Sequence, residues 1–544
     1  MKVYKHLALA TVVLFALTAC TATGGSKGSQ GASSLPSTSP AAVGSLSSVT
    51  WNDPDGEPPS IDPGLSAAPN NSPIISNMCD SLLKYNESNT LVPSLASSFT
   101  QPNPQTLVLN LRSDVKFWDG HPLTPADVVY DLDRQRDPAF GAPFGSSYFT
   151  DIADISATGP NQVTIKFTEP DEVFKYVLGT SAGQISEAAY VKAEGSKYGS
   201  PNGGLMCSGP FKFDKWTAGQ SISMTANSSY WNPSLRPKVK KVTFTFLSDP
   251  SALTNALTTG QIDGSSGIAE SQVSQLQKSG AGTVYAGQGT LFQQVLFTTR
   301  KGPASDPNVR KAMSLALDRK LLADSIFGNG ATPVWSVAFP ATWGYSANIF
   351  KKTYETLPGQ KVDLSEAMKL VNAAGPAAKK PMSVNITSGD APTQEVATYM
   401  KSQLAKIGLT LDIKVITPDQ QHNLWADPKA MAQYDMMLIP NYLDFPDPAE
   451  TALFAVPGGG YNLSGYNNPE VTKLLAEAKG TADDNQRATL LSQAIAIFQG
   501  QDTNNIPLVN YPNLVFMGKR ITGAPTSLVQ QTYGPWAASL GASK

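Results

Sequence analysis

The stretch that decides the fold reads LNLRSDVKFWDGHPLTPADV over residues 109–128. Apolar and polar residues alternate over residues 106–112, which predicts a half-buried strand. Residues 116–122 are rich in turn formers. The segment Thr124–Asp127 then predicts the start of a helix, because it offers a capping Thr, a Pro at the first helical position and an acid at the third. A strand, a turn and a helix are therefore expected in succession.

The rest of the chain mixes helix and strand signals without a clear repeat. Asp306-Pro307 predicts the start of a helix that continues through Ile326, and Gly328 is placed to stop it. This mixture predicts an α/β or α+β fold rather than a single run of alternating strands and helices. Further helices are predicted at residues 251–259, 363–374 and 393–407, from Pro469 onward and at 484–499, and strands at 162–167, 210–216, 221–225, 241–247, 410–416, 434–439 and 506–509.

Composition narrows the classes of function. At about 100–200 residues per domain, 544 residues correspond to about three or four domain-sized units. The 41 basic and 43 acidic residues give a net charge of −2. A chain so balanced has no electrostatic footprint for nucleic acid, and no nucleic-acid partner is expected. Only three His and three Cys occur, which excludes most His- or Cys-rich metal sites, so neither a metal nor a cofactor is expected.

The first residues indicate export. A basic start and an apolar run over residues 7–17 are typical of a secretory signal, and the run is too short for a membrane anchor of about 20 residues. It ends in Leu17-Thr18-Ala19-Cys20, which looks like a bacterial lipobox, so we expect residues 1–19 to be removed and Cys20 to carry a lipid. An ordinary signal peptide with an incidental cysteine is the alternative. Residues 20–48 predict a lipidated cysteine followed by a flexible tether rich in small residues.

Two cysteines remain in the body, Cys79 and Cys207. Outside the cytoplasm an even number of cysteines permits a disulfide, and we predict one between these two. Two buried free thiols are the alternative, because free cysteine is often buried.

Four blocks in a fixed order resemble the extracytoplasmic solute-binding proteins of peptide-type ABC importers, the family called solute-binding protein family 5. The resemblance runs from about residue 48 to the end of the chain. It departs from the family where Cys207-Ser208-Gly209 replaces a Gly-Thr-Gly and where Asn441 replaces a Trp. The blocks are residues 109–128, Gly209–Phe213 with Tyr230-Trp231 downstream, Asn308–Arg319, and Leu443–Pro448 with Gly465–Glu470 after it.

The resemblance implies an α/β fold of the periplasmic-binding-protein type (Venus-flytrap, class II), with two lobes around a cleft. Lobe I is expected over residues 49–288, with an extra subdomain at about 90–195. Lobe II is expected over residues 289–505, and residues 506–544 are expected to return to lobe I.

The resemblance also implies binding rather than catalysis. Such a receptor would close its lobes on an oligopeptide or dipeptide and deliver it to the permease subunits of an ABC importer. It would act as a monomer, held at the outer face of the bacterial cell membrane by the lipid on Cys20. Another small solute, such as an oligosaccharide, a metal chelate or haem, is the alternative within the same class. A protein retained only for signalling or adhesion is a further alternative.

The expected ligand site centres on Asp444. The resemblance places Asp444 where peptide receptors of the family hold the acid that meets a ligand amine. A turn aspartate in a Pro-rich loop is the alternative. Asn441, Tyr442 and Phe445 surround it and are candidates for the cleft wall, as is Trp335 in a stretch broken by Pro and Gly; core packing is the alternative for the aromatic residues.

Two other kinds of chemistry deserve a test. Gly179–Gly183 fits the G-x-S-x-G motif of serine hydrolases, with Ser181 as nucleophile, provided that residues 172–178 form a strand. The oxyanion motif of that class is absent. For a metal, the mature chain offers only His121 and His422 as imidazole ligands.

Overall fold

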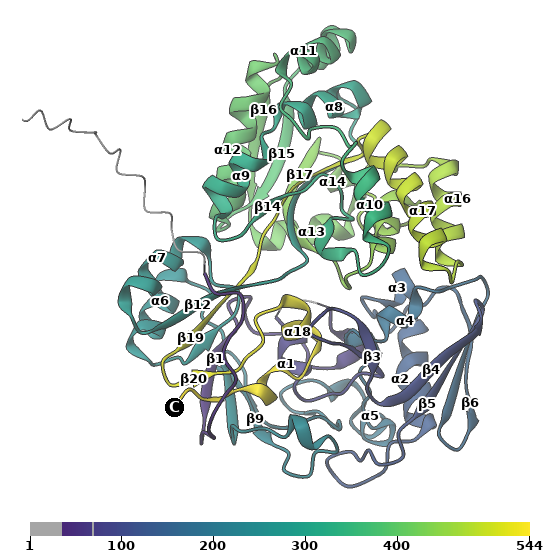
Figure 1. The fold of residues 1–544 in the computed structure, drawn as a ribbon, viewed down its shortest axis with the longest axis vertical. Helices are drawn as coiled ribbons and strands as arrows, with labels where there is room; N and C mark the ends of the chain where they lie inside the picture. Colours follow the sequence, from purple (N-terminus) through teal and green to yellow (C-terminus); the bar gives the residue numbers. More distant parts are fainter. Residues whose placement is uncertain (1–34, 68–69) are drawn as a thin grey trace, which may run out of the picture. The chain divides into compact units, whose positions relative to one another are not determined.

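Two large mixed sheets organise the computed structural model, which describes residues 35–67 and 70–544 (Figure 1). Cys20, the expected signal peptide and the first part of the expected tether lie outside the described residues. Residues 35–544 form one compact unit. Among the described residues, no helix is both long enough and apolar enough to cross a membrane.

The first sheet gathers strands from the two ends of the chain. Its central strand β1 pairs in parallel with both β10 and β11, and β19, from the C-terminal region, lies between β11 and β12. The strand order is β12 (Gly282–Gly287), β19 (Asn513–Gly518), β11 (Gly264–Ser265), β1 (Val49–Asn52), β10 (Lys241–Thr245), β9 (Ser221–Ala226) and β8 (Phe211–Thr217).

The second sheet is built from the intervening part of the chain. Strands β13 and β17 are antiparallel, whereas β15 pairs in parallel with β16 and β17. The strand order is β14 (Thr332–Pro333), β18 (Asn505–Asn510), β13 (Leu291–Phe297), β17 (Met436–Tyr442), β15 (Met382–Thr387) and β16 (Leu411–Ile416).

The chain passes from the first sheet to the second between Gly287 and Leu291, and returns between Asn510 and Asn513. We call residues 291–510 lobe II and the described residues before and after them lobe I. The finer domain limits expected from the sequence stay predictions. Lobe I also carries an antiparallel four-stranded sheet with the order β4 (Ala96–Asn103), β5 (Thr106–Leu111), β7 (Gln162–Phe167) and β6 (Ile152–Gly159).

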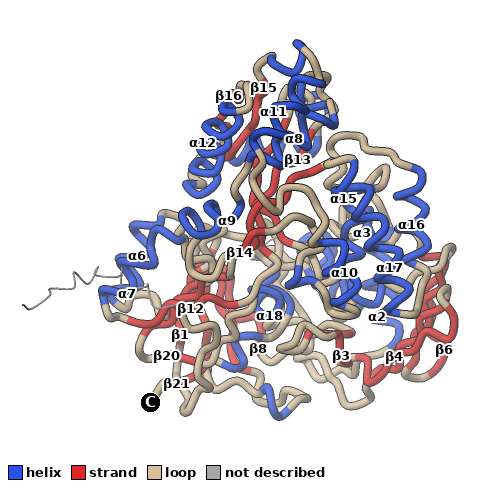
Figure 2. The backbone as a smooth tube through the Cα atoms, turned by 45° about the horizontal axis from the view of Figure 1, so that its top comes forward, coloured by secondary structure: helices blue, strands red, loops and turns tan. Residues whose placement is uncertain are grey.

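Helices cover these sheets, and Figures 1 and 2 both show α12 beside the β15–β16 end of the lobe II sheet. The main helices of lobe I are α1 (Ser72–Ile75), α2 (Pro125–Arg136), α3 (Gly145–Tyr148), α4 (Phe174–Val177), α5 (Ala188–Glu194), α6 (Pro250–Thr259), α7 (Glu270–Ser279) and α18 (Leu528–Tyr533). Those of lobe II are α8 (Pro307–Ala316), α9 (Arg319–Leu322), α10 (Ala347–Tyr354), α11 (Leu364–Ala373), α12 (Ala391–Lys406), α13 (Pro418–Ala426), α14 (Pro428–Met431), α15 (Ala452–Ala455), α16 (Pro469–Lys479) and α17 (Asp484–Ile495).

The strand, turn and helix expected around residues 109–128 are confirmed. Strand β5 ends at Leu111, and α2 begins at Pro125. The Thr124 backbone N–H and hydroxyl donate to Asp127 Oδ2 at 2.9 and 2.6 Å, which ties down the first turn. Asp127 Oδ1 also accepts a hydrogen bond from the Ala188 N–H at 3.1 Å, so the capping acid joins α2 to α5.

The single helix expected from Pro307 through Ile326 is wrong. Helix α8 stops at Ala316, Leu317 is extended with φ −96° and ψ 118°, and α9 restarts at Arg319. The break lets the buried Arg319 guanidinium donate to the Pro507 carbonyl oxygen at 2.9 Å and to the Ser314 carbonyl oxygen at 3.0 Å. A buried cation needs such acceptors, and their supply overrides local helix propensity.

The C-terminal segment is packed into lobe I by aromatic contacts. The rings of Trp51 and Trp536 lie 4.6 Å apart, and Trp536 Nε1 donates to the Pro73 carbonyl oxygen at 2.7 Å. Gly264 is required beside Trp51, because a Cβ at that position would lie 2.4 Å from the Trp51 ring. Both ends of the chain thus help to build the core of lobe I.

A disulfide joins Cys79 to Cys207, two buried residues separated by 128 positions in the sequence. Helix α1 ends at Ile75, before Cys79. Beside the bond, Asp80 accepts hydrogen bonds from the Ser208 hydroxyl at 2.8 Å and the Tyr230 hydroxyl at 2.7 Å. The disulfide and this polar contact together hold the start of lobe I against the segment that leads into β8.

Replacing both Cys79 and Cys207 by Ser should lower the free energy of unfolding by about 2–5 kcal/mol, because the bond restricts a long loop in the unfolded chain. Chemical denaturation of the double variant and of the unchanged protein measures the difference. A thiol reductant is the control: it should lower the unfolding midpoint of the unchanged protein and leave that of the double variant where it is. Equal midpoints for the reduced and oxidised protein would contradict a stabilising role.

Candidate ligand-binding cleft

A cavity of about 740 Å³ is lined by residues of both lobes. On the lobe I side, Asp53 follows the end of β1, and Ser266 follows the end of the neighbouring parallel strand β11. Ligands of open α/β sheets bind outside the carboxyl ends of the strands, so the topology itself predicts a site here. On the lobe II side, the wall includes Asn441 and Tyr442 at the end of β17 and Leu291 at the start of β13.

Asp444 contributes a half-buried carboxyl group to this wall. The Tyr148 hydroxyl, from α3 of lobe I, donates to Asp444 Oδ2 at 3.4 Å. Burial raises the pKa of the Asp444 carboxyl to about 7, and the Tyr148 hydrogen bond opposes that shift. No basic side chain contributes to this pKa. The group is therefore an acid in the cleft without a cationic partner from the described residues.

Glu450 fixes the loop that carries Asp444. Its two carboxylate oxygens accept hydrogen bonds from the backbone N–H groups of Asp444 and Phe445 at 3.0 and 2.8 Å. Burial, and then the charge of Asp444, raises the pKa of the Glu450 carboxyl well above its ordinary value. The two neighbouring carboxyl groups thus oppose each other's ionisation.

Asn441 and Tyr442 both line the cavity, but they make different contacts. The Tyr442 hydroxyl donates to the Ala67 carbonyl oxygen and so bridges the two lobes. Asn441 is 6% exposed, and its Oδ1 accepts a hydrogen bond from the Tyr442 N–H at 2.8 Å. A hydrogen bond between the Asn441 side chain and the Tyr461 phenol, which also lines the cavity, opposes the shift by which burial raises the pKa of Tyr461.

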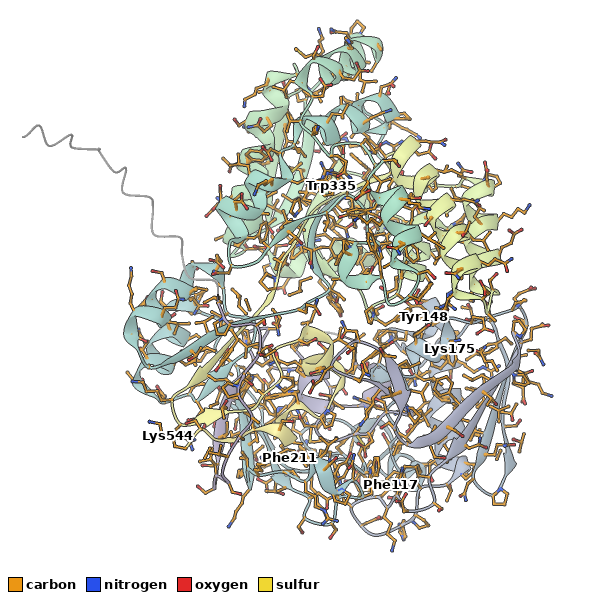
Figure 3. All side chains as sticks on the ribbon, in the orientation of Figure 1. Phe117, Tyr148, Lys175, Phe211, Trp335 and Lys544 are labelled. Atoms are coloured by element: carbon orange, nitrogen blue, oxygen red, sulfur yellow. A yellow bond between two sulfur atoms is a disulfide. The ribbon has the colours of Figure 1, made fainter. Side chains whose placement is uncertain are left out.

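Phe445 and Trp335 are not among the residues that line the cavity. Phe445 is fully buried, with its ring centre 5.6 Å from that of Tyr148 and 6.0 Å from that of Tyr176. It fills the apolar core beneath the loop, which is why it turns away from the cleft. Trp335 is partly buried in lobe II, where it is labelled in Figure 3, and its Nε1 donates to the Gly359 carbonyl oxygen at 2.7 Å.

Several residues that line the cavity were not predicted from the sequence. Asp53 and Asp55 form part of the lobe I wall, and Tyr148 and Trp425 come from segments remote in the sequence. A signal for Asp53 did exist, since it follows a strand directly and the carboxyl ends of parallel strands form binding sites. Tyr148 carries no such local signal, because only the tertiary fold brings α3 to the loop of Asp444.

The serine hydrolase arrangement is wrong. The segment before Ser181 forms helix α4 instead of the strand that a nucleophile elbow requires. The Ser181 side chain is fully buried, and its hydroxyl donates to the Ser66 carbonyl oxygen. A nucleophile must be accessible to its substrate, and this hydroxyl is not.

The two histidines do not come together. His121 Nδ1 lies 2.7 Å from Glu187 Oε1 and 2.8 Å from Asp119 Oδ2, in lobe I. These carboxylates raise the pKa of His121, with the Glu187 hydrogen bond as the larger cause. His422 is exposed on α13 of lobe II. The two-histidine metal site considered from the sequence is therefore not formed.

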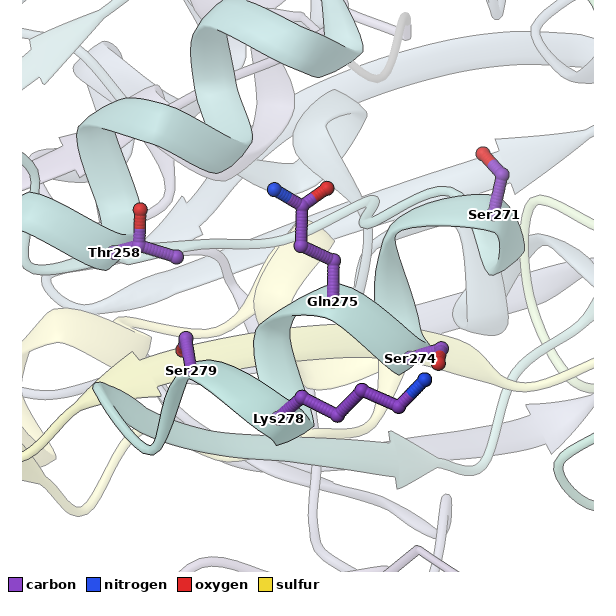
Figure 4. A pocket seen from close by; sticks show the side chains of 6 residues that line it. All are labelled: Thr258, Ser271, Ser274, Gln275, Lys278 and Ser279. Carbon is purple, nitrogen blue, oxygen red and sulfur yellow. The ribbon is translucent and has the colours of Figure 1, made fainter.

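A second depression of about 610 Å³ lies on α6 and α7 of lobe I (Figure 4). Most of its lining side chains are exposed, and all of them are polar. It lacks the apolar walls and converging buried polar groups of a ligand site. We therefore assign the candidate site to the cleft. The lining residues of this depression are Thr258, Ser271, Ser274, Gln275, Lys278 and Ser279.

Comparisons with known proteins identify the family of this chain. The family model for bacterial extracellular solute-binding proteins, family 5 Middle, matches residues 90–462. The chain is 24% identical over 437 residues to the periplasmic murein peptide-binding protein MppA of Escherichia coli, covering 78% of this chain and 80% of MppA. It is 24% identical over 485 residues to the periplasmic oligopeptide-binding protein OppA of Haemophilus influenzae, covering 84% of this chain and 87% of OppA.

Solved structures share the fold. Haemophilus influenzae OppA in complex with the peptide RPPGFSPFR matches with a TM-score of 0.73 at 21% identity, over 92% of this chain and 99% of that one. The binding protein AgaA of A. tumefaciens R10, in complex with agropinic acid, matches with a TM-score of 0.78 at 20% identity, over 91% of this chain and 99% of that one. With its two-lobed α/β fold and a family match that spans most of its length, the chain belongs to the bacterial extracellular solute-binding proteins of family 5.

Proposed function

We propose that this protein is the substrate-binding lipoprotein of an ABC importer and that it captures oligopeptides or dipeptides with a free amino group. The observation that carries the proposal is the Asp444 carboxyl group, which faces a cavity lined by both lobes and has no cationic partner among the described residues. The peptide-binding relatives support the solute class. The lipobox ending at Cys20 supports the lipid anchor, and the family supports delivery to a permease.

The geometry suits a ligand amine at Asp444. An ammonium group that takes the place of the proton on Asp444 would form a charge-assisted hydrogen bond in a site shielded from water. The Asn441 amide and the Tyr461 phenol are polar groups of the cavity wall that can form hydrogen bonds with a peptide backbone. Trp425, Tyr461 and Tyr511 supply aromatic walls that can accept ligand side chains of different shapes.

Contacts between the lobes support capture by closure. Lys479 Nζ, at the end of α16 in lobe II, lies 2.6 Å from Asp151 Oδ2 and 3.0 Å from Asp171 Oδ2 of lobe I. The Lys479 carbonyl oxygen also accepts a hydrogen bond from the Glu172 N–H at 2.6 Å. A receptor that closes on its ligand needs such contacts in the closed arrangement, because they set the equilibrium that the ligand shifts.

Asp444→Asn should weaken binding of an amine-bearing tripeptide by about tenfold to a hundredfold, because it removes the charge from a charge-assisted hydrogen bond. Isothermal titration calorimetry measures the effect. The same tripeptide with an acetylated amino group is the matched control and should lose little affinity on this substitution. Equal losses for the two peptides would remove Asp444 from the role of amine anchor.

The pH dependence of binding follows from the same group. Affinity for the amine-bearing tripeptide should rise from about pH 5 to about pH 8, because Asp444, with a pKa of about 7, must lose its proton to pair with the ammonium group. Glu450 opposes that ionisation, the phenols of Tyr148 and Tyr442 face the same carboxyl, and no basic side chain lines the cavity there. Titrations of the unchanged protein and of Asp444→Asn across this range should differ in slope; equal slopes would contradict the assignment.

The raised pKa of Asp444 also sets the direction in which folding stability changes with pH, because proton binding and folding are linked. The folded state raises the pKa of Asp444, so it holds this proton more tightly than the unfolded chain does. The resulting stability is fully present below the unfolded pKa of about 4 and is lost as the pH rises through about 7. Thermal unfolding of the ligand-free protein should show this loss, and Asp444→Asn should reduce it. A variant with the same pH profile as the unchanged protein would refute it.

Lys479→Met should weaken ligand binding by about tenfold although Lys479 does not line the cavity, because closure would then leave the buried Asp171 carboxylate without its cation. Lys473→Met is the matched control, since Lys473 lies on the same helix and pairs only with the exposed Glu477, at 3.7 Å. Titration with one tripeptide compares the two variants. Equal affinities would show that the Lys479 contacts do not contribute to closure.

A further inference from the structure

The cleft is acidic and has no basic counterpart. Asp53, Asp55 and Asp444 line the cavity, whereas none of the described residues that line it is Lys, Arg or His. A free peptide carries a carboxylate as well as an ammonium group, so it would bring a negative charge into a cavity that already holds three carboxyl groups. Electrostatic complementarity instead favours an occupant with excess positive charge.

Asp53 and Asp55 form a second acidic centre apart from the loop of Asp444. The Asp53 side chain is 5% exposed, and its Oδ1 accepts a hydrogen bond from the Asp55 N–H at 3.1 Å. Burial, and then the charge of Asp55, raises the pKa of Asp53 well above its ordinary value. Desolvation also raises the pKa of Asp55. No basic group contributes to either shift.

Several buried acids elsewhere in the fold have partners. Asp62 lies 2.6 Å from the Arg134 guanidinium, and Glu172 lies 2.7 Å from Lys175 Nζ. Asp80 accepts hydrogen bonds from three side chains. A buried carboxylate without such partners costs several kcal/mol, roughly, even after the protein relaxes. Asp53 is buried and has no cationic partner among the described residues, and it shares its cavity with the half-buried Asp444 and the exposed Asp55.

Two further observations concern the same cavity. The Asn441 side chain is buried and lines the cavity beside the Tyr461 phenol, and a hydrogen bond between these two side chains opposes the shift by which burial raises the pKa of Tyr461. The Tyr442 phenol lies near both acidic centres, because burial and then the carboxylates of Asp444 and Asp55 are among the causes that raise its pKa. These polar side chains and both acidic centres thus belong to the same space.

We propose that the cleft selects a ligand with two cationic groups, amine or guanidinium, one paired with Asp444 and the other with the Asp53–Asp55 pair, and without a free carboxylate inside the cavity. This inference rests on the proposed solute-binding function and narrows its ligand class. Two sources supply that chemistry: a basic peptide with a blocked carboxyl end, and a polyamine. The peptide is favoured because the relatives that this chain matches are peptide-binding proteins.

Calorimetric titration of the purified full chain with a matched series of ligands tests the inference. The series is Ala-Lys-Ala-amide, its free acid, Ala-Ala-Ala-amide and spermidine. Ala-Lys-Ala-amide should bind at least tenfold more tightly than its free acid and at least tenfold more tightly than Ala-Ala-Ala-amide. The first comparison changes only the carboxyl end, and the second removes only the side-chain cation.

Substitutions at Asp53 and Asp55 test where the second cationic group of the ligand binds. Asp53→Asn/Asp55→Asn should remove most of the preference for Ala-Lys-Ala-amide over Ala-Ala-Ala-amide. Glu87→Gln/Asp154→Asn is the matched control, because it changes the net charge equally at two exposed residues outside the cavity. Asp55→Asn alone is a milder variant, since Asp55 is exposed and its side chain accepts none of the hydrogen bonds described here.

The outcomes separate the inference from the proposed function. Equal affinity for all three peptides would overturn the inference while the peptide receptor stands. Tighter binding of the free acid would do the same and would point to a carboxylate-binding group elsewhere. Binding of spermidine with no binding of any peptide would support the dication and overturn the peptide function. Binding of none of the four would overturn both.

Discussion

The backbone N–H groups of Asp444 and Phe445 donate hydrogen bonds to the Glu450 carboxylate, and the candidate ligand site depends on these two bonds. They fix one short loop so that its two adjacent side chains lie in different environments. Asp444 faces the cavity, and Phe445 packs among aromatic rings contributed by lobe I. If the loop turned by one residue, an aromatic ring would enter the cleft and a carboxyl group would enter the core. The second of these is the more costly, because a buried unpaired charge is strongly disfavoured.

The sequence predicts the fold best where a local signal and the tertiary environment agree. Thr124 and Asp127 define the start of α2 because their hydrogen bonds close within three residues. The break after Ala316 could not be predicted in this way. Its cause is Arg319, whose guanidinium needs the carbonyl oxygen of Pro507, a partner 188 positions away in the sequence. Apolar periodicity across that break is compatible with one helix. The break is supported by this long-range acceptor and by Asp318, whose Oδ1 accepts a hydrogen bond from the Leu321 N–H at 3.0 Å and caps α9.

The residues of the candidate site also differ in whether a sequence signal could predict them. The family resemblance predicts Asp444 as a ligand residue, and the neighbours Asn441 and Tyr442 share the wall of the cavity with it. Phe445 could not be separated from them by residue type, since an aromatic residue beside a binding acid is equally suited to the cleft and to the core. Asp53 and Tyr148 reach the cavity from segments remote from that loop, so their proximity to it is a property of the folded chain.

The proposed closure of the lobes would depend on the ionisation of the acids in the cleft. Open lobes would leave Asp53 and Asp444 in contact with water, which solvates their charges; closure removes that water. Without a cation in the cavity the carboxyl groups must then take up protons or remain uncompensated, and either requirement opposes closure. A cationic ligand removes the opposition, and the contacts of Lys479 with Asp151 and Asp171 then favour the closed arrangement. In such a receptor the charge of the solute would affect binding in two ways. It would shift the equilibrium between open and closed lobes, and it would set the strength of the direct contacts in the cavity.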